Sequence, residues 1–283
     1  MRASTRHLQR LPRTLPAGAR VAPAITVTLL LFGGGLLGAL RESVEPPLGG
    51  APSTWSLSTW RALLADPTFT EALAFSLRIA LLSALLSGGL ALLVVGPMRA
   101  SGRGVRLLGG LPVPAPHLII AVLAVTWLAP GGLAQRALGS LPFDLIHDRQ
   151  GLGIVLVYVY KETPFLVLLL LAVMGGRLRE REEAAAVLGV TPAQRLRWVI
   201  LPAVRRPLAI GTLIVAAFAL GAFEVPLVLG PNYPPTLATY AYQATLNDPL
   251  GGQGRAAASL LVAAAASIVM AIAVVRLIGA DDA

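Results

Sequence analysis

The stretch EEAAAVLGVTPAQRLRWVILP, residues 182–202, decides how the rest of the chain is interpreted. Residues 182–188 are nearly all good helix formers. Gly189 then allows a sharp turn, because glycine adopts a positive φ without steric cost. The stretch is polar and lies between two long apolar runs, so it predicts a compact helical unit that connects two membrane spans.

A second short helix is predicted directly after this turn. Thr191 is suited to the N-cap, Pro192 to the first helical position, and Gln194 to the partner position of a capping box. We expect Pro202 and Pro207 to close the unit before the next apolar run. Two interpretations stay open on these grounds: a knob that contacts a soluble partner, or a solvated loop that merely joins two spans.

Composition places the whole chain in the membrane. Of its 283 residues, 55% are hydrophobic and only 13% are charged, and the mean hydropathy is +0.73. The charged fraction is about half of what a soluble domain carries. The absence of cysteine excludes disulfides, thiol catalysis and thiolate metal sites. The net charge of +9 is better explained by orientation in the membrane than by nucleic-acid binding.

Six apolar runs are each long enough to cross about 30 Å of hydrocarbon. They predict an all-α, polytopic membrane protein in which a basic cytoplasmic tail, residues 1–20, precedes one transmembrane domain, residues 21–280. Cleavage of the first run as a signal peptide, near Gly38 and Ala39, is the less favoured alternative. The predicted spans are residues 21–40, 72–96, 107–128, 152–174, 207–229 and 256–278, and the loop that carries the opening stretch is 175–206.

Glycine and proline residues are expected to change the helical structure or the packing of several of these spans. The prolines at 112, 114 and 116 are expected to break or unwind the start of the third run. Residues 230–255 read as a loop rich in proline and glycine. Gly33–Gly35 and Gly88-Gly89 fall inside spans, where we expect small residues to allow close helix packing.

Basic residues set the predicted orientation. With the amino terminus in the cytoplasm, sixteen of the 23 basic residues lie in the inner segments and five in the outer segments. The positive-inside rule favours this arrangement, with both termini and the loop 175–206 in the cytoplasm.

Several enzyme classes lack their motifs. The chain has no Gly-x-x-x-x-Gly-Lys-Ser/Thr sequence, so any ATP that drives transport must be hydrolysed by another subunit. No His-Glu-x-x-His zinc pattern and no Gly-x-Ser-x-Gly elbow occur. We therefore expect that this chain is not an enzyme and binds no cofactor or metal.

Charged side chains inside spans are costly, so they are candidates for a transport path. Glu224 lies between Gly221 and Pro226, where a loosened backbone would line a water-filled cavity. A structural pair of Glu224 with Lys161 or Arg78 is equally open, and Arg78 is expected to extend its guanidinium to the membrane interface.

Lys161 and Glu162 stand at the middle of the fourth span, followed by Pro164, which should kink it. Neighbouring residues point about 100° apart on a helix, so both cannot face one partner. This pattern favours a gate or pathway over a lipid-facing helix, with an internal salt bridge as the open alternative.

Seven positions carry a resemblance to a known family. They are Glu183-Ala184-Ala185, then Gly189 after three residues, Val199 after nine more, and Leu201-Pro202 after one. The pattern resembles the EAA loop of binding-protein-dependent ABC importer permeases, with Val199 where that family usually has Ile. In that family the loop docks into a groove on the ATP-hydrolysing subunit. The resemblance implies ATPase-coupling roles for Glu182, Glu183, Ala184, Ala185, Gly189, Leu201 and Pro202.

The resemblance extends to KETPF, residues 161–165, and FEVPLVLG, residues 223–230. These are similar to the spermidine/putrescine-type branch, which includes importers resembling those for iron(III), thiamine, sulfate, molybdate and phosphonates. It covers roughly residues 72–278. It implies a type I ABC importer permease-like fold and a small polar or charged solute of the polyamine, iron, thiamine, oxyanion or phosphonate class.

The family also implies an assembly. Its members are to be expected in a bacterial or archaeal cytoplasmic membrane, with ABC ATPase subunits, a second permease subunit in a hetero- or homodimer, an extracytoplasmic substrate-binding protein and membrane lipid. ATP is used by the ATPase partner. The alternatives are an ion-coupled secondary transporter that uses Glu224, Glu162 and Lys161, and a membrane anchor without transport.

Overall fold

The computed structural model describes residues 17–44, 55–139, 144–249 and 251–279, and every regular element in these residues is a helix. This confirms the all-α prediction. Most of the predicted tail, residues 1–16, lies outside the described residues. The helices are α1 (Ala17–Thr28), α2 (Gly34–Val44), α3 (Ser58–Ala65), α4 (Pro67–Ala100), α5 (Arg103–Gly110), α6 (His117–Leu128), α7 (Leu133–Leu138), α8 (Leu152–Val173), α9 (Gly176–Val187), α10 (Pro192–Arg195), α11 (Leu201–Gly221), α12 (Glu224–Leu229), α13 (Leu237–Asn247) and α14 (Gly252–Gly279), with π-helical segments at Leu29–Gly33 and Leu196–Ile200.

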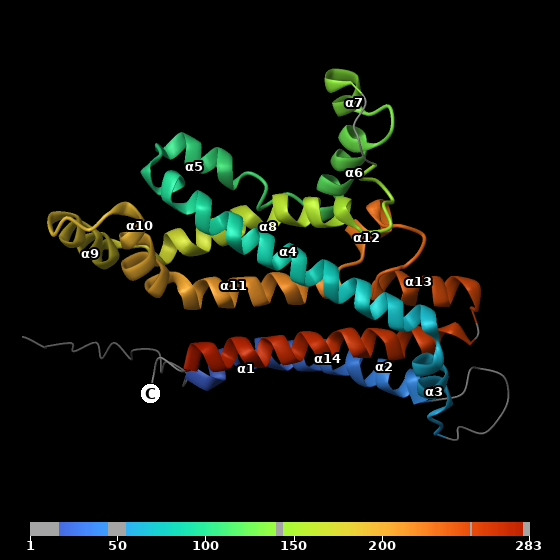
Figure 1. Cartoon of the computed structure of the whole chain (residues 1–283). Helices are drawn as coiled ribbons and strands as arrows, with labels where there is room; N and C mark the ends of the chain where they lie inside the picture. The colour runs from blue at the N-terminus through green and yellow to red at the C-terminus, as the bar shows by residue number, and fades with distance from the viewer. Residues whose placement is uncertain (1–16, 45–54, 140–143, 250, 280–283) are drawn as a thin grey trace, which may run out of the picture.

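Six helical segments within the described residues are long and apolar enough to cross a membrane, as predicted. They are Val21–Val44, Pro67–Ala100, His117–Leu138, Leu152–Val173, Pro192–Gly221 and Gly252–Gly279. The first residues of α1 and the last of α14 lie at the same end of the bundle as α9 and α10 (Figure 1). This is the relative placement expected of a chain whose two ends lie on the same side as the loop 175–206.

Helices α4, α8 and α11 pack against one another at the centre of the bundle (Figure 1). Gly88 allows α4 to approach α11, since an added Cβ there would lie 2.6 Å from Cγ2 of Thr212. Gly211 does the same between α11 and α8, where an added Cβ would meet the side chains of Leu166 and Leu169 at 2.6 and 2.7 Å. Close packing by small residues is therefore confirmed at Gly88.

The same expectation is wrong for Gly89 and for Gly33–Gly35. An added Cβ at any of these positions would meet nothing within 4 Å in the described chain. Gly89 is on the outer side of α4, and the three others belong to a peripheral helix with few neighbours. Their small size is not used for packing inside this chain.

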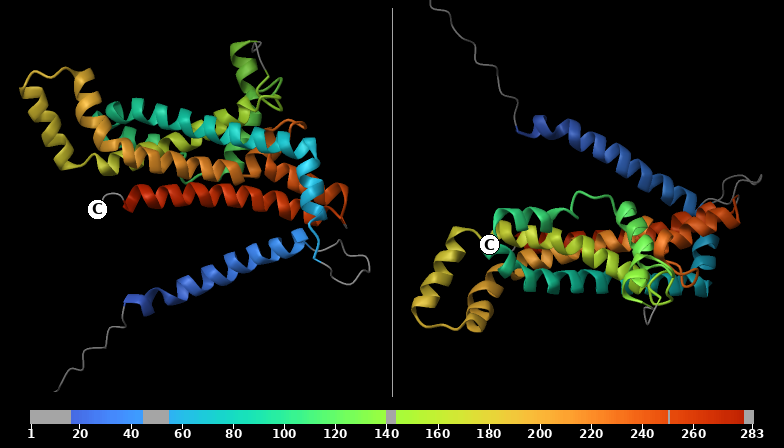
Figure 2. Two further views of the ribbon diagram at one scale, coloured as in Figure 1. Left: turned by 60° about the horizontal axis from the view of Figure 1, so that its bottom comes forward. Right: turned by 90° about the horizontal axis from the view of Figure 1, so that it is seen from above.

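The amino-terminal helical segment lies at the edge of the bundle. Its carboxyl end is held against α3 and the start of α14, whereas α1 diverges from the bundle in both views of Figure 2. Trp60 Nε1 donates a hydrogen bond of 3.2 Å to Ser43 Oγ, and an added Cβ at Gly254 would lie 3.1 Å from the carbonyl oxygen of Glu42. Most side chains between these contacts and residue 21 are exposed.

The third predicted span, residues 107–128, is not one helix. Helix α5 ends at Gly110, a turn carries the three prolines, and α6 starts at His117. The expected break is thus confirmed, because each proline lacks an amide donor and its ring crowds the preceding turn. The apolar segment continues into α7, and α6 and α7 project crosswise from the packed bundle (Figure 1).

The fifth span also has other bounds than 207–229. It ends at Gly221, and Glu224 begins the separate short helix α12. The segment 230–255, predicted as a loop, contains helix α13 instead. Thr236 caps α13, and five consecutive residues from Leu237 to Ala241 are buried, so packing overrides the proline and glycine content around it.

Candidate functional site

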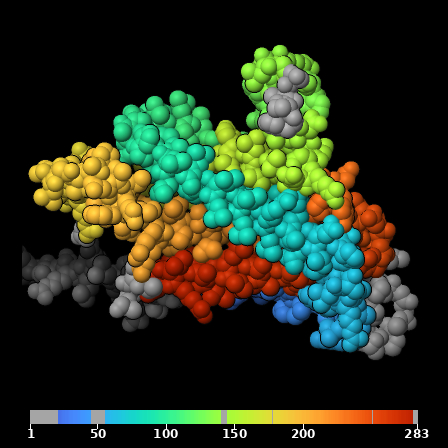
Figure 3. Space-filling model, viewed as in Figure 1, coloured from blue at the N-terminus to red at the C-terminus, as the bar shows by residue number. Residues whose placement is uncertain are grey.

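The α9–α10 unit, residues 176–195, projects beyond one end of the bundle (Figure 3). Gly189 forms its turn with a φ of +75°, the left-handed region that favours glycine. The amides of Gly189 and Val190 bond to the carbonyls of Ala186 and Ala185 at 3.0 Å each. These two hydrogen bonds close α9 as a glycine C-cap does. They confirm the predicted helix and turn.

The predicted capping box starts α10. The Thr191 side chain accepts a bond from the Gln194 amide, and the Gln194 side chain accepts one from the Thr191 amide at 3.0 Å. These reciprocal bonds satisfy two backbone donors that a helix start leaves free. The predicted capping box is therefore confirmed as the start of the second helix.

Closure of the unit by Pro202 and Pro207 is wrong. Helical structure runs without interruption from Pro192 to Gly221, over 30 residues. Pro202 lies in the first turn of α11, directly after the π-helical segment Leu196–Ile200. A π-helical turn is an insertion that changes the hydrogen-bond ladder locally, and it lies where the ring of Pro202 would otherwise crowd the carbonyl of Trp198. Leu201 and Pro202 are both exposed at this junction.

Glu182 makes its contact within the chain. Its Oε1 accepts a hydrogen bond of 2.6 Å from Nη1 of Arg99, near the end of α4, and both side chains are about one-fifth exposed (23% and 20%). Leu178, one turn earlier in α9, is buried among the side chains of α8 and α11. The ion pair and this apolar contact fix the orientation of α9 on the bundle.

Glu183 lies on the exposed side of the same helix. Its Oε1 accepts a bond of 2.8 Å from Nε of Arg179, one turn earlier. This hydrogen bond and the charge of Glu183 raise the pKa of Arg179. The pair is open to solvent, so it contributes little to stability and leaves the carboxylate accessible to a partner.

Two apolar side chains on the unit, and a third just after it in the π-helical segment, were not singled out from the sequence. Val187, Leu188 and Trp198 are 88%, 81% and 68% exposed, while Ala184 and Gly189 beside them are also exposed and Ala185 is half-buried. Exposed apolar groups gathered at one tip are typical of an interaction surface. In the sequence, apolar residues at these positions are equally consistent with burial against the bundle. Their exposure is therefore seen only in the structure.

Lys161 and Glu162 are both buried in α8 and have separate partners. Lys161 Nζ donates a hydrogen bond of 2.7 Å to the carbonyl of Val113, and Glu162 Oε1 lies 2.8 Å from Nε2 of His117. The alternative of an internal salt bridge thus applies to Glu162, which pairs with His117 at the start of α6, whereas Lys161 bonds to a backbone carbonyl of the α5–α6 connection. The proline turn supplies an exposed carbonyl for the lysine, which the sequence alone did not indicate.

Glu224 pairs with neither Lys161 nor Arg78 in the described part of the chain. It is the first residue of α12 and lines a cavity of about 400 Å³. The backbone is interrupted between Gly221 and Glu224, as the sequence predicted. The lining residues of this cavity are His117, Tyr158, Phe218, Ala222, Phe223, Glu224 and Val225.

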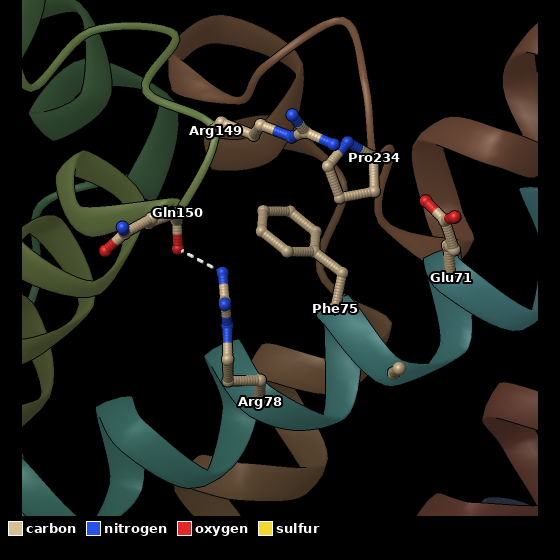
Figure 4. A pocket seen from close by; sticks show the side chains of 7 residues that line it. Glu71, Phe75, Arg78, Arg149, Gln150 and Pro234 are labelled. Atoms are coloured by element: carbon tan, nitrogen blue, oxygen red, sulfur yellow. Dashed lines mark hydrogen bonds between the residues drawn. The ribbon is translucent and has the colours of Figure 1, made fainter.

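Arg78 belongs to a different pocket of about 430 Å³, at the end of the bundle away from the α9–α10 unit (Figure 4). Its Nη2 donates a bond of 2.6 Å to the carbonyl of Gln150, and its guanidinium carbon lies 5.2 Å from the centre of the Phe75 ring. Arg149 and Glu71 complete the charged part of the lining. The guanidinium is exposed and is held by a loop carbonyl.

Comparison with known proteins places this fold and these motifs in one family. The sequence profile described as "binding-protein-dependent transport system inner membrane component" matches residues 89–280, which include the α9–α10 unit, Lys161, Glu162 and Glu224. The chain is 34% identical over 239 residues to the inner membrane ABC transporter permease protein YnjC of Escherichia coli strain K12, covering 80% of this chain and 46% of that protein.

Other relatives carry substrate names. The identity is 27% to a probable sulfate transport system permease protein of Nephroselmis olivacea, over 79% of this chain and 81% of that one. It is 31% to the thiamine transport system permease protein ThiP of Brucella abortus strain 2308, over 77% of this chain and 39% of that one. The chain therefore spans about half or less of the length of two of these three relatives.

Solved structures agree in fold. A crystal structure of a bacterial ABC transporter involved in the import of the acidic polysaccharide alginate matches with a TM-score of 0.72 and 19% identity, over 91% of this chain and 94% of that chain. The same kind of transporter in complex with a periplasmic protein bound to an alginate pentasaccharide matches with a TM-score of 0.69 and 20% identity, over 89% and 91%. From the extent of the profile match and the identity to its relatives, we conclude that the chain belongs to the family of binding-protein-dependent transport system inner membrane components, the permease subunits of ABC importers.

Proposed function

We propose that this permease forms half of a solute path with a second permease subunit and is driven by a separate ABC ATPase that binds the α9–α10 unit. One observation carries the proposal: a single helical rod runs from Pro192 in this unit to Gly221, three residues before Glu224. A displacement of the unit by a partner would be transmitted along this rod to the cavity beside α12.

The surface of the unit supports a protein partner. Val187 and Leu188 are more than four-fifths exposed, and the Glu183 carboxylate is accessible beside them. Burial of an exposed leucine stabilises a contact by about 1.5–3 kcal/mol. The partner must supply ATP hydrolysis, because this chain has no phosphate-binding loop.

The opposite end of the bundle carries the pocket with Arg78, Arg149 and Glu71 (Figure 4). We place the docking of an extracytoplasmic substrate-binding protein at this end. The related alginate transporter was crystallised with a ligand-bound periplasmic protein, which supports such a partner. The second permease, hetero- or homodimeric, would complete the path between the two ends.

The ion-coupled alternative is not favoured. Lys161 and Glu162 are each engaged with the α5–α6 connection, and the relatives are ABC transporter subunits. The substrate is a small polar or charged solute, for which the names of relatives suggest thiamine, sulfate or molybdenum compounds.

The test is purification of the tagged chain in a gentle detergent, with mass spectrometry of its partners and an ATPase assay. We expect an ABC ATPase to co-purify with the native chain and to be lost from the double variant Val187→Asp, Leu188→Asp. Leu138→Asp is the matched control, because Leu138 is 79% exposed on α7, away from the α9–α10 unit. Absence of an ATPase from the native preparation, or its retention by the double variant, would contradict the proposal.

A further inference from the structure

The cavity beside α12 has a composition that the transport function alone does not require. Helix α12 packs against α6 and α8, and the cavity lies where these helices meet the end of α11 (Figure 1). Tyr158 is the seventh residue of α8, so it lies about 9 Å along the helix axis from its outer end. The cavity is therefore set into the outer part of the bundle, and a volume of about 400 Å³ is in the range of small-molecule sites.

Two polar groups of the lining have no partner in the described residues. Tyr158 is fully buried, with 0% of its surface exposed, and its hydroxyl makes no hydrogen bond there. Glu224, in contrast, is exposed, and its carboxylate has no hydrogen bond or ion pair to any residue that the structure describes. A buried hydroxyl without a partner costs about 1–3 kcal/mol, but a molecule in the cavity cannot reach this one directly, because Tyr158 has no exposed surface.

Aromatic rings form most of the remaining surface. The centroids of His117 and Phe218 are 4.5 Å apart, and the rings of Tyr158 and Phe218 meet edge to face at 6.3 Å and 86°. Phe223 adds a further ring next to Glu224. Aromatic faces attract cations, by about 0.5–2 kcal/mol per ring in desolvated sites.

The charge of the lining is negative. Nε2 of His117 is occupied by Glu162, and Lys161, which does not line the cavity, donates to the Val113 carbonyl. Among the seven lining residues, Glu224 is the one acidic residue, and none is Lys or Arg.

We propose that this cavity is a transient binding site for an organic cation, held by the Glu224 carboxylate and the rings of Phe218, Phe223 and His117. The inference rests on the proposed transport function and names its substrate class as an ammonium or other nitrogen-cation compound. An oxyanion would be repelled by Glu224, since no free cationic side chain lines the cavity.

A metal ion fits the site less well. Hard cations take six or more oxygen ligands, and the side chains of this lining offer one accessible carboxylate. No group of three His, Cys, Asp or Glu side chains suited to a metal occurs in the part of the chain that the structure describes. Aromatic faces bind a soft, alkylated cation and contribute little to a hydrated metal ion.

The test measures binding to the detergent-purified complex by equilibrium dialysis. The probes are choline, spermidine and thiamine as three kinds of nitrogen cation, with sulfate and ferric ion as the competing classes. We expect at least one nitrogen cation to bind, Glu224→Gln to weaken its binding at least tenfold, and Phe218→Leu to weaken it two- to thirtyfold. Glu42→Gln removes a charge at the exposed outer end of α2 and should leave binding unchanged.

The outcomes separate this inference from the proposed function. Binding of sulfate or ferric ion in place of all three cations, or cation binding that survives Glu224→Gln, overturns the cation site. The same preparation is assayed for its ATPase partner. If no cation binds but the ATPase is retained, the cation site is contradicted and the coupling proposal is not. If the ATPase is absent, the coupling proposal is contradicted, and any measured cation binding still supports the site.

Discussion

Arg99 and Glu182 form an ion pair of 2.6 Å that joins the end of α4 to α9, although 83 residues separate them in sequence. Both side chains are mostly buried, at 23% and 20% exposure. The pair therefore attaches the α9–α10 unit to a central span. Glu182 orients the unit, whereas Glu183 remains exposed, and we propose that Glu183 contacts the partner.

We expect this pair to show strong coupling in a double-mutant cycle. Arg99→Met and Glu182→Gln should each destabilise the docking of α9, by about 1–3 kcal/mol for a hydrogen bond between charged groups. The double variant should cost clearly less than the sum, because neither charge is then left without its partner. Amide hydrogen exchange of α9 is the measurement, and strictly additive effects would contradict the pairing.

The effect of a substitution at Gly189 should depend only on how readily the new residue adopts a positive φ. Its φ is +75°, and an added Cβ would meet nothing within 4 Å. Gly189→Asp should keep membrane insertion and strain the turn by about 1–2 kcal/mol, uncoupling uptake from ATP hydrolysis. Gly189→Asn should retain more activity, since asparagine adopts the left-handed region more readily.

Gly176 provides the control for that series. It begins α9, and an added Cβ there would also meet nothing within 4 Å, but its φ is not positive. Gly176→Asp should leave the ratio of uptake to ATP hydrolysis unchanged. Normal coupled uptake by Gly189→Asp would show that the turn geometry is not needed.

Gly153 should be intolerant of any side chain. An added Cβ would overlap the backbone carbonyl of Leu145, which cannot rotate away as a side chain can. We expect Gly153→Ala to displace the segment that holds Asp148 and Gln150, and to lower the thermal unfolding temperature of the purified protein by several degrees. Gly89→Ala, where nothing lies within 4 Å, should unfold at or above the temperature of the native chain, and equal behaviour of the two would contradict the packing.

Asp66 links stability to pH at the outer end of α4. Its carboxylate accepts bonds of 2.7 Å from the Tyr240 hydroxyl and 2.9 Å from the Thr68 amide. Burial raises the pKa of Asp66, but these hydrogen bonds outweigh it and the net pKa lies below its ordinary value of 3.8. A lowered folded-state pKa contributes stability above the unfolded-state pKa, and this contribution is lost as pH falls through the folded-state value.

Thermal unfolding between pH 3 and 7 checks this link. The unfolding temperature of the native chain should fall more steeply below about pH 4 than that of Asp66→Asn, which keeps a side chain suited to the helix cap. Tyr240→Phe should lower stability at neutral pH and flatten the acid limb. Parallel curves for all three proteins would show that the pKa of Asp66 does not differ between the folded and unfolded states.

Much of the membrane architecture was predictable from local patterns. Hydropathy indicates six spans because each must satisfy its backbone inside about 30 Å of hydrocarbon. The turn at Gly189 and the capping box of Thr191 and Gln194 depend only on neighbouring residues, so the sequence predicts them correctly.

What depends on distant residues was not predictable. The rod from Pro192 to Gly221 passes through two prolines because a π-helical turn and tertiary packing accommodate them. The partners of Lys161 and Glu162 are brought in by the proline turn between α5 and α6. Helix α13 forms where turn-forming residues predict a loop, since its buried residues outweigh their effect.

The absence of cysteine from the chain allows the most direct test of coupling. A single cysteine at Leu188 is cross-linked to its neighbours in native membranes, with and without ATP, and the product is identified by mass spectrometry. We predict a cross-link to an ABC ATPase whose yield changes with ATP, and none to that subunit from a single cysteine at Leu138. Failure of the Leu188 position to reach an ATPase, or equal cross-linking from Leu138, would contradict coupling through the α9–α10 unit.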